Sequence, residues 1–344
     1  MPPKSQEGSS PATWLAEHVR IGCMWYLHYA WGEEAGKPFN RFQVSRGYTT
    51  VHVKPARWFE ARSTIDLYED DDGWELRLKY LHGRLALPVE TPVVSDPFVE
   101  FGLVHTPFLG FEEHINRYRV QGSMLLERNG VLNSADLGLA VGALLGPKMT
   151  DAQRESTGAH RPGQWGSVSL GVYNGGGYHG AELNQDKVLM LRASLRPAGP
   201  WMPGLQATYY YVYGKGNSEA EPDWTLHDAY LSFQHPAFVL AGQLVYGRGA
   251  QCGDRLSADG RAEAYRGASG FAELELPWID SALFFRYDWF DWRDTGQRDR
   301  FIAGAAYTFF RNCALLVDLD YARELDAETA DSWAVKLSMR VELP

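Results

Sequence analysis

The chain ends in the stretch SWAVKLSMRVEL, residues 332–343. Every second residue from Trp333 onwards is apolar, while Lys336, Arg340 and Glu342 occupy positions between the apolar ones. Successive side chains of a β-strand point to opposite faces, so this alternation predicts a strand with one apolar and one charged face. An α-helix of the same composition would spread its charges around the whole circumference.

The same period of two recurs along most of the chain. Between 187 and 197, for example, Leu189, Leu191 and Leu195 alternate with Arg192 and Arg196. We therefore predict an all-β chain of about 16 antiparallel strands. The predicted strands span 18–32, 42–54, 58–68, 74–87, 98–106, 135–145, 165–174, 187–197, 205–214, 224–235, 238–248, 265–276, 281–292, 300–310, 313–323 and 332–343.

The joints between these strands alternate in length. Compact joints recur, at 54–57, 235–237, 277–280 and 310–312. Longer polar joints fall between them, at 106–134, 175–186, 215–223, 249–264, 293–299 and 324–331. Short turns on one rim and long loops on the other are typical of a transmembrane barrel. Two joints depart from this rule, because 69–73 is short for a loop and 146–163 is long for a turn.

The composition agrees with a barrel that has lipid outside and water inside. Aromatic residues make up 13% of the 344 residues, and no run approaches the 18 apolar residues of a membrane-spanning helix. Tryptophans fall at both predicted rims, which predicts two aromatic belts. They are Trp14, Trp58, Trp201 and Trp278 at the short-turn rim, and Trp31, Trp74, Trp224, Trp289, Trp292 and Trp333 at the long-loop rim. The net charge of −10 and the absence of a basic run exclude nucleic acid as a partner.

These patterns predict one domain over residues 1–344, a transmembrane antiparallel up-and-down β-barrel with an N-terminal extension at 1–16. Such a barrel belongs in the bacterial outer membrane, with the lipid bilayer as its partner. The start MPPKSQEGSS lacks the basic and apolar regions of a signal peptide, which export requires. The chain ends at Leu343 and Pro344, whereas outer-membrane barrels commonly finish on an aromatic residue.

Several stretches resemble the phosphate-selective porin family of outer-membrane proteins (O/P-type). The longest is VYNGGGYHGAE at 172–182, followed by NQDK at 184–187 and RASLRP at 192–197. Shorter ones lie at 42–48, 101–108, 134–138 and 285–288. The resemblance implies a trimeric porin of about 16 strands whose third outer loop folds into the lumen as a constriction.

That loop would be residues 107–134, the longest joint of the chain. It offers both signs of charge and polar rings to a passing solute. Its candidate constriction residues are Glu112, Glu113, His114, Arg117, Tyr118 and Arg119. The alternative is an external loop that covers the rim of the barrel.

Basic residues on the predicted lumen faces are candidate pore-lining groups, since cationic side chains replace the hydration shell of an anion. They are Arg46, Arg62, Arg77, Arg192, Arg196, Arg286, Lys336 and Arg340. Acidic residues such as Asp66, Glu273, Asp288, Asp318 and Asp320 are interleaved with them, so pairing across neighbouring strands is the alternative role for every charge. This mixed charge favours passive diffusion of small hydrophilic solutes or ions with weak selectivity. Anions such as phosphate remain among the candidates.

No catalytic, cofactor or metal-binding motif is present, because the chain lacks HExxH, GxSxG and a Walker loop. We therefore expect a channel rather than an enzyme, with no cofactor and no metal. Two alternatives stay open. One is a barrel with a plugged lumen that acts as an enzyme or an interaction protein. The other is a soluble β protein such as a propeller, which would show an internal repeat that this sequence lacks.

Overall fold

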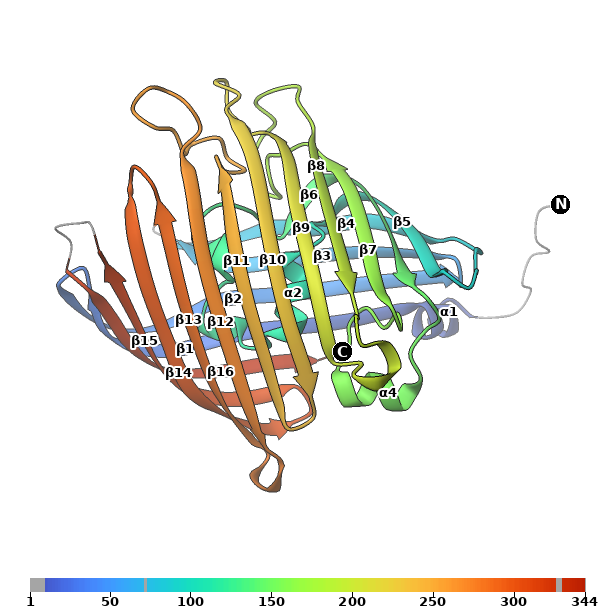
Figure 1. The fold of residues 1–344 in the computed structure, drawn as a ribbon. Coiled ribbons are helices and arrows are strands. Elements are labelled where there is room, and N and C mark those ends of the chain that lie inside the picture. The colour runs from blue at the N-terminus through green and yellow to red at the C-terminus, as the bar shows by residue number, and fades with distance from the viewer. Residues whose placement is uncertain (1–9, 71–72, 326–329, 344) are drawn as a thin grey trace.

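The computed structural model describes residues 10–70, 73–325 and 330–343, and antiparallel strands dominate it (Figure 1). The strands are β1 Val19–Glu34, β2 Lys37–Ala56, β3 Phe59–Asp70, β4 Gly73–Ala86, β5 Val94–His105, β6 Ala135–Leu145, β7 Gly166–Tyr173, β8 Val188–Leu195, β9 Leu205–Lys215, β10 Asp223–His235, β11 Phe238–Arg248, β12 Ala264–Leu276, β13 Ser281–Trp292, β14 Gly296–Phe310, β15 Cys313–Glu324 and β16 Ser332–Leu343. Each pairs with its neighbours in sequence, and β1 also pairs with β16. The predicted closed barrel of 16 antiparallel strands is confirmed.

The stretch quoted first, β16, is the strand that closes the barrel. It pairs with β1 from Cys23 opposite Leu343 to Glu33 opposite Trp333. On β16 the outward Leu337 is 53% exposed, whereas the neighbouring Ser338 points inward and is 1% exposed. A sheet with apolar residues outside and polar residues inside is the reverse of a soluble β-sandwich, and it is the arrangement that lipid requires.

Short helices lie at the two rims and in one loop. They are α1 Pro11–His18, α2 Leu109–Ile115, η1 Arg119–Gln121, α3 Leu125–Arg128, α4 Asp151–Thr157, η2 Gly199–Trp201 and η3 Pro277–Ile279. None of the helices in the described part of the chain is long and apolar enough to span a membrane. Helix α1 covers residues 11–16 of the predicted N-terminal extension and continues to His18, while residues 1–9 lie outside the described residues.

The connection between β1 and β2 is tighter than predicted. Only Ala35 and Gly36 separate the strands, and their φ angles are 49° and 79°. Positive φ at both central residues is the geometry of a type I′ turn, whose twist matches that of the flanking strands. Strand β2 therefore begins at Lys37 rather than near 42. Of the short joint predicted at 69–73, residues 71–72 lie outside the described residues.

The tryptophan belts are only partly as predicted. Trp58, Trp201 and Trp278 project from the short-turn rim with 62%, 96% and 76% of their surface exposed. Trp224 and Trp292 were expected at the long-loop rim, but they are 0% and 6% exposed inside the barrel. Alternation does not assign the faces of a strand when both faces carry apolar residues, as in β10 and β13.

The interior of the barrel also contains more apolar side chains than the alternation predicts. The inward positions of β8–β14 include fully or almost fully buried apolar residues, such as Met190, Val212, Leu226 and Ile302. These residues form one hydrophobic cluster with the loop that follows β5. Half of the lumen wall is therefore a packed core, and the water-accessible space lies on the side of β1–β5 and β16.

Candidate functional site

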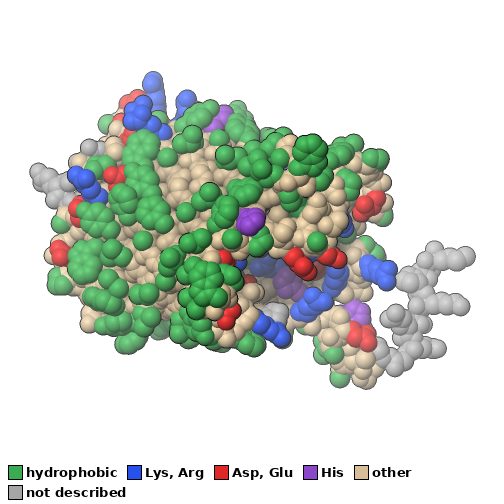
Figure 2. All heavy atoms as spheres, turned by 60° about the horizontal axis from the view of Figure 1, so that its bottom comes forward, with side chains coloured by type: hydrophobic (Ala, Val, Ile, Leu, Met, Phe, Trp, Pro, Cys, Tyr) green, Lys and Arg blue, Asp and Glu red, His purple; other side chains and the backbone are tan. Residues whose placement is uncertain are grey.

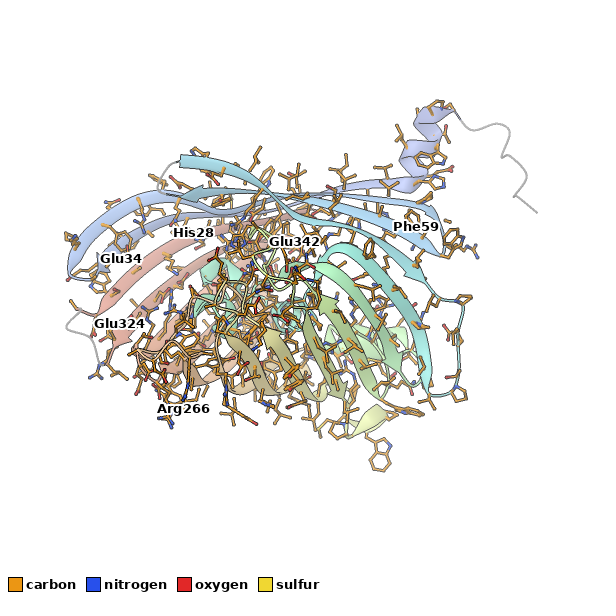
Figure 3. All side chains as sticks on the ribbon, turned by 90° about the horizontal axis from the view of Figure 1, so that it is seen from above. His28, Glu34, Phe59, Arg266, Glu324 and Glu342 are labelled. Carbon is orange, nitrogen blue, oxygen red and sulfur yellow. The ribbon has the colours of Figure 1, made fainter. Side chains whose placement is uncertain are left out.

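The loop of residues 107–134, here named the inward loop, lies inside the barrel. Figure 1 places α2 within the ring of strands, and Figure 3, which shows the barrel from above, also has short helices enclosed by the strands. The Phe108 ring stacks on Tyr210 of β9 at 5.1 Å between centroids, and Tyr118 stacks on Phe284 of β13 at 4.4 Å. Leu109 is fully buried. Full burial of each such side chain contributes about 1.5–3 kcal/mol, so the apolar wall holds the loop firmly.

Basic side chains of the wall hold the backbone of the same loop. Nε of Arg192 donates to the Pro107 carbonyl at 2.9 Å, and a terminal nitrogen of Arg286 donates to the Ser123 carbonyl at 3.0 Å. Nζ of Lys336 donates to the Gln121 carbonyl at 2.6 Å, and Arg340 donates to the Arg117 carbonyl at 2.9 Å. A loop with so little regular structure leaves carbonyl groups unpaired, and a buried carbonyl needs a donor. Four predicted pore cations thus use some of their hydrogen-bond donors to hold the loop.

The inward loop divides the open part of the lumen into two cavities. The smaller, about 250 Å³, lies toward the long-loop rim and is lined by Ala30, Phe39 and Lys336 among others. The larger, about 1150 Å³, opens at the short-turn rim. Figure 2 shows that rim, where Lys, Arg, Asp, Glu and His side chains surround a hollow beside a hydrophobic outer surface. Tyr26 and Arg119 line both cavities, so these two side chains lie where the cavities approach each other.

Arg119 is 7% exposed and is held by two carboxylates. Its Nε lies 2.6 Å from Glu113, and one terminal nitrogen lies 2.8 Å from both oxygens of Glu127. Another nitrogen donates to the Tyr48 hydroxyl at 2.8 Å. Burial alone would raise the pKa of Glu127, but Arg119, Lys79 and Arg46 together outweigh burial and lower that pKa below the usual range. The place where the two cavities approach each other therefore carries a neutralised guanidinium rather than a free one.

The two cavities have a strongly basic lining. Among the residues that the structure describes, the larger is lined by eleven Lys and Arg side chains and six Asp and Glu side chains, a formal excess of five positive charges in a chain whose net charge is −10. The basic ones are Arg20, Lys54, Arg57, Arg62, Lys79, Arg84, Arg117, Arg119, Arg161, Arg192 and Arg340. The smaller cavity is lined by four basic residues (Arg41, Arg46, Arg119 and Lys336) and by no acidic one among the described residues.

Acidic side chains on the same inward faces are placed elsewhere. Asp66, Asp288, Asp318 and Asp320 are at most 5% exposed and line neither cavity. They are paired with basic side chains at the wall, for instance Asp288 with Arg128 of the inward loop at 2.6 Å. These four acids are thus kept away from the open cavities, whose described lining carries more bases than acids.

Arg62 and Arg192 are among the arginines of the larger cavity that have no carboxylate within ion-pair distance in the described ranges of the chain. Arg62 packs over the Tyr80 ring at 4.3 Å. Arg192 donates to the hydroxyls of Ser167 at 3.0 Å and Ser194 at 2.5 Å, and it packs over the Phe111 ring at 4.3 Å. Neutral partners hold these side chains in place without cancelling their charge, so the charge remains available to an anion.

The structure separates the predicted site residues into three groups. The larger cavity is lined by Glu113, His114, Arg62, Arg117, Arg119, Arg192 and Arg340. The smaller cavity is lined by Arg46, Arg119 and Lys336. Neither cavity is lined by Glu112, Tyr118, Arg77, Arg196 and Arg286. Burial raises the pKa of Glu112 well above its usual value, because its side of α2 faces the packed wall.

The remaining residues of the third group have structural partners. Arg77 lies 2.9 Å from Asp66, and Arg286 lies 2.7 Å from Asp288. Arg196 donates to the Pro203 carbonyl at the short-turn rim, at 2.5 Å.

One group of cavity residues was not predicted from the sequence. The joint between β6 and β7 carries α4, and after it His160 and Arg161 reach the larger cavity. The His160 ring stacks on His114 of the inward loop, with 3.6 Å between centroids. Segments from opposite rims therefore meet inside the barrel. The unusual length of the predicted joint 146–163 was the one sequence feature that pointed to this arrangement.

Comparisons with known proteins support the fold. No protein-family model matches the sequence, and no curated protein matches it. Solved structures do match: an anion-selective porin from Comamonas acidovorans (TM-score 0.63, 10% identity, 94% of this chain and 99% of that one) and OprB from Pseudomonas putida (0.63, 11%, 96% and 96%). OmpF from Salmonella typhi, in a complex with daunomycin, matches with a TM-score of 0.61 at 12% identity over 94% and 97% of the two chains. At these identities the similarity establishes a porin-like barrel fold.

Proposed function

We propose that this chain is an outer-membrane porin, a passive channel that prefers small hydrophilic anions. The observation that carries the proposal is the sorting of charge: the two open cavities are lined by an excess of Lys and Arg, while most inward acids are buried at the wall. Anions crossing the barrel would exchange part of their hydration for guanidinium and ammonium groups. The resemblance to phosphate-selective porins and the anion-selective structural neighbour agree with this preference.

The outer surface supports the placement in a membrane. Outward residues such as Phe42, Phe101 and Leu244 are 83%, 69% and 65% exposed, on strands far apart around the ring. A water-soluble protein rarely exposes so much contiguous apolar surface, whereas a lipid bilayer covers it. The bacterial outer membrane is the compartment in which barrels of this kind occur.

Within this proposal, Arg119 and Tyr26 form the constriction and the larger cavity acts as the vestibule. The neutralised Arg119 would limit the size of the solute. The vestibule cations Arg62 and Arg192 would set the sign of its charge, because they lack carboxylate partners in the described ranges. The homotrimer stays a prediction from the family resemblance.

One observation favours a second candidate, a barrel with a plugged lumen. The inward loop fills the β8–β14 half of the barrel, and of the described side chains only the buried Tyr26 and Arg119 line both cavities. A barrel closed at this point would serve as an interaction protein or an enzyme scaffold rather than as a channel.

Planar bilayer recording separates the two candidates. Purified protein should give discrete conductance steps. Its reversal potential in a KCl gradient should be shifted from zero toward the equilibrium potential of chloride. Absence of steps from a folded barrel, identified by its faster gel mobility before boiling, would support the plugged lumen. Conductance steps whose reversal potential is shifted toward the equilibrium potential of potassium would overturn the anion preference.

A further inference from the structure

The wall of the larger cavity holds a cluster of potential metal ligands that the channel proposal does not use. His82 on β4 and Glu100 and His105 on β5 offer one ligand atom each, and these three atoms all lie within 4.8 Å of one another. All three residues line the cavity, so a small ion can reach them from the short-turn rim. His82 is 8% and Glu100 is 6% exposed.

The hydrogen bonds of the two histidines indicate which ring nitrogen carries the lone pair. Nδ1 of His82 lies 3.2 Å from the Leu103 carbonyl, an acceptor, so Nδ1 carries the proton and Nε2 carries the lone pair. A carbonyl in this position is the usual outer partner of a metal-binding histidine. Nε2 of His105 lies 2.9 Å from a terminal nitrogen of Arg62, which can only donate, so this Nε2 also presents a lone pair.

The backbone lets the two strands that carry these ligands approach each other closely. Gly102 lies directly opposite His82 in the β4–β5 register, two residues along β5 from Glu100. Its φ is +124°, and a Cβ at this position would lie 2.3 Å from the Leu81 carbonyl oxygen and 3.0 Å from Cα of His82. Glycine therefore permits close approach of the two strands and places no side chain between the ligands.

We propose that His82, Glu100 and His105 bind a Zn²⁺ ion on the wall of the larger cavity. Two imidazoles and one carboxylate form a common three-ligand zinc set that leaves a fourth position for water or an anion. Tetrahedral bonds of about 2.0–2.1 Å place ligand atoms about 3.4 Å apart, so the ligands close in by roughly an ångström on binding. Because all three ligands line the basic cavity, an anion from this cavity would complete the site.

Arg62 and Arg84 are the competitors of the metal. Arg62 must leave Nε2 of His105, and it can keep its contact with Oγ1 of Thr64 at 3.1 Å. Arg84 holds Oε1 of Glu100 at 2.9 Å and leaves the second carboxylate oxygen for the ion. Removal of the Arg62 charge should therefore tighten zinc binding, a response that simple packing of the histidines does not predict.

The test is titration of the refolded, metal-free full-length barrel in detergent with ZnCl₂ by calorimetry. Wild type should bind one ion. His82→Ala and His105→Ala should weaken binding by more than the roughly 10- to 100-fold that loss of an outer partner costs. Arg62→Gln should tighten it by about tenfold, the effect of removing one charge about 5 Å from a dication in water. His28→Ala is the matched control, because His28 lines the other cavity between Ser338 and Ser45.

Cobalt gives a second readout that does not depend on channel activity. Co²⁺ bound to the wild type should show the strong visible absorption of a tetrahedral site, and His105→Ala should abolish it. Gel mobility before boiling checks that each variant is folded. No saturable binding by wild type, or equal binding by wild type and both histidine variants, would overturn the site. An Arg62→Gln variant that binds zinc no more tightly than wild type would also count against it.

Discussion

The ion pair between Arg119 and Glu127 at the constriction provides the sharpest test of the proposed channel. Replacement of Arg119 by Met keeps most of the side-chain volume but removes the positive charge between two carboxylates that lie 2.6 and 2.8 Å away. A unit charge about 5 Å from the path of an ion contributes about 0.8 kcal/mol in water, and about 0.5 kcal/mol after screening at 0.1 M salt. This energy enriches cations about two- to fourfold and depletes anions equally, so the cation-to-anion permeability ratio should rise about 5- to 15-fold.

The assay is the reversal potential of single channels in a KCl gradient at pH 7.5. Glu127→Gln changes the other partner of the same pair, so it should shift the permeability ratio toward anions by a similar factor. Arg119→Lys keeps the charge and should leave the sign of the selectivity unchanged. If Arg119→Met leaves the reversal potential where it is in wild type, or moves it toward chloride, the constriction does not lie at this residue.

Three further outcomes are expected. The double change Arg62→Gln and Arg192→Gln should reduce anion preference in the same recordings, because both charges lack carboxylate partners in the described chain; Arg196→Gln, outside both cavities, should not. Acid should loosen the inward loop. The pKa of Glu127 is lowered from 4.5 to about 2 by its basic neighbours against the effect of burial. The stability that Glu127 contributes is therefore present above pH 4.5 and is lost as the pH falls toward 2. A conductance change over this range that persists in Glu127→Gln would contradict this. Leu337→Arg, on the outward face, should destabilise the barrel in liposomes by about 2–4 kcal/mol in urea titrations if that position lies near the bilayer midplane; an unchanged midpoint would argue against a lipid-facing β16.

The fold could be predicted because its determinants are local. Alternation along a strand depends on each residue and its neighbours two positions away, as in Leu337 and Ser338, and the lengths of the joints order the strands around a ring. The prediction failed where local pattern is ambiguous. The sequence pattern placed Trp224 in a belt, whereas it lies inside the barrel, because β10 carries apolar residues on both faces and alternation does not assign them. Strand β2 starts earlier than predicted because two residues suffice for its turn.

The candidate site could be predicted only in part, because its properties depend on which side chains meet across the lumen. Loop 107–134 and its charges were identifiable from the sequence, but the neutralisation of Arg119 by Glu113 and Glu127 was not. Similarly, the sequence showed a mixture of charges. The excess of bases over acids in the lining of the cavities requires the positions of the wall and the loop together.

The sequence by itself determined a closed, amphipathic barrel, since the period of two and the hydrogen-bonding needs of a strand leave few other solutions in lipid. Tertiary structure alone decided what the lumen contains. The inward loop binds to the apolar wall of β8–β14, and the free energy of burying that surface, rather than any repeat in the sequence, sets the place and the charge of the remaining open space. Contacts between residues far apart in the chain, such as Arg128 with Asp288, carry that information.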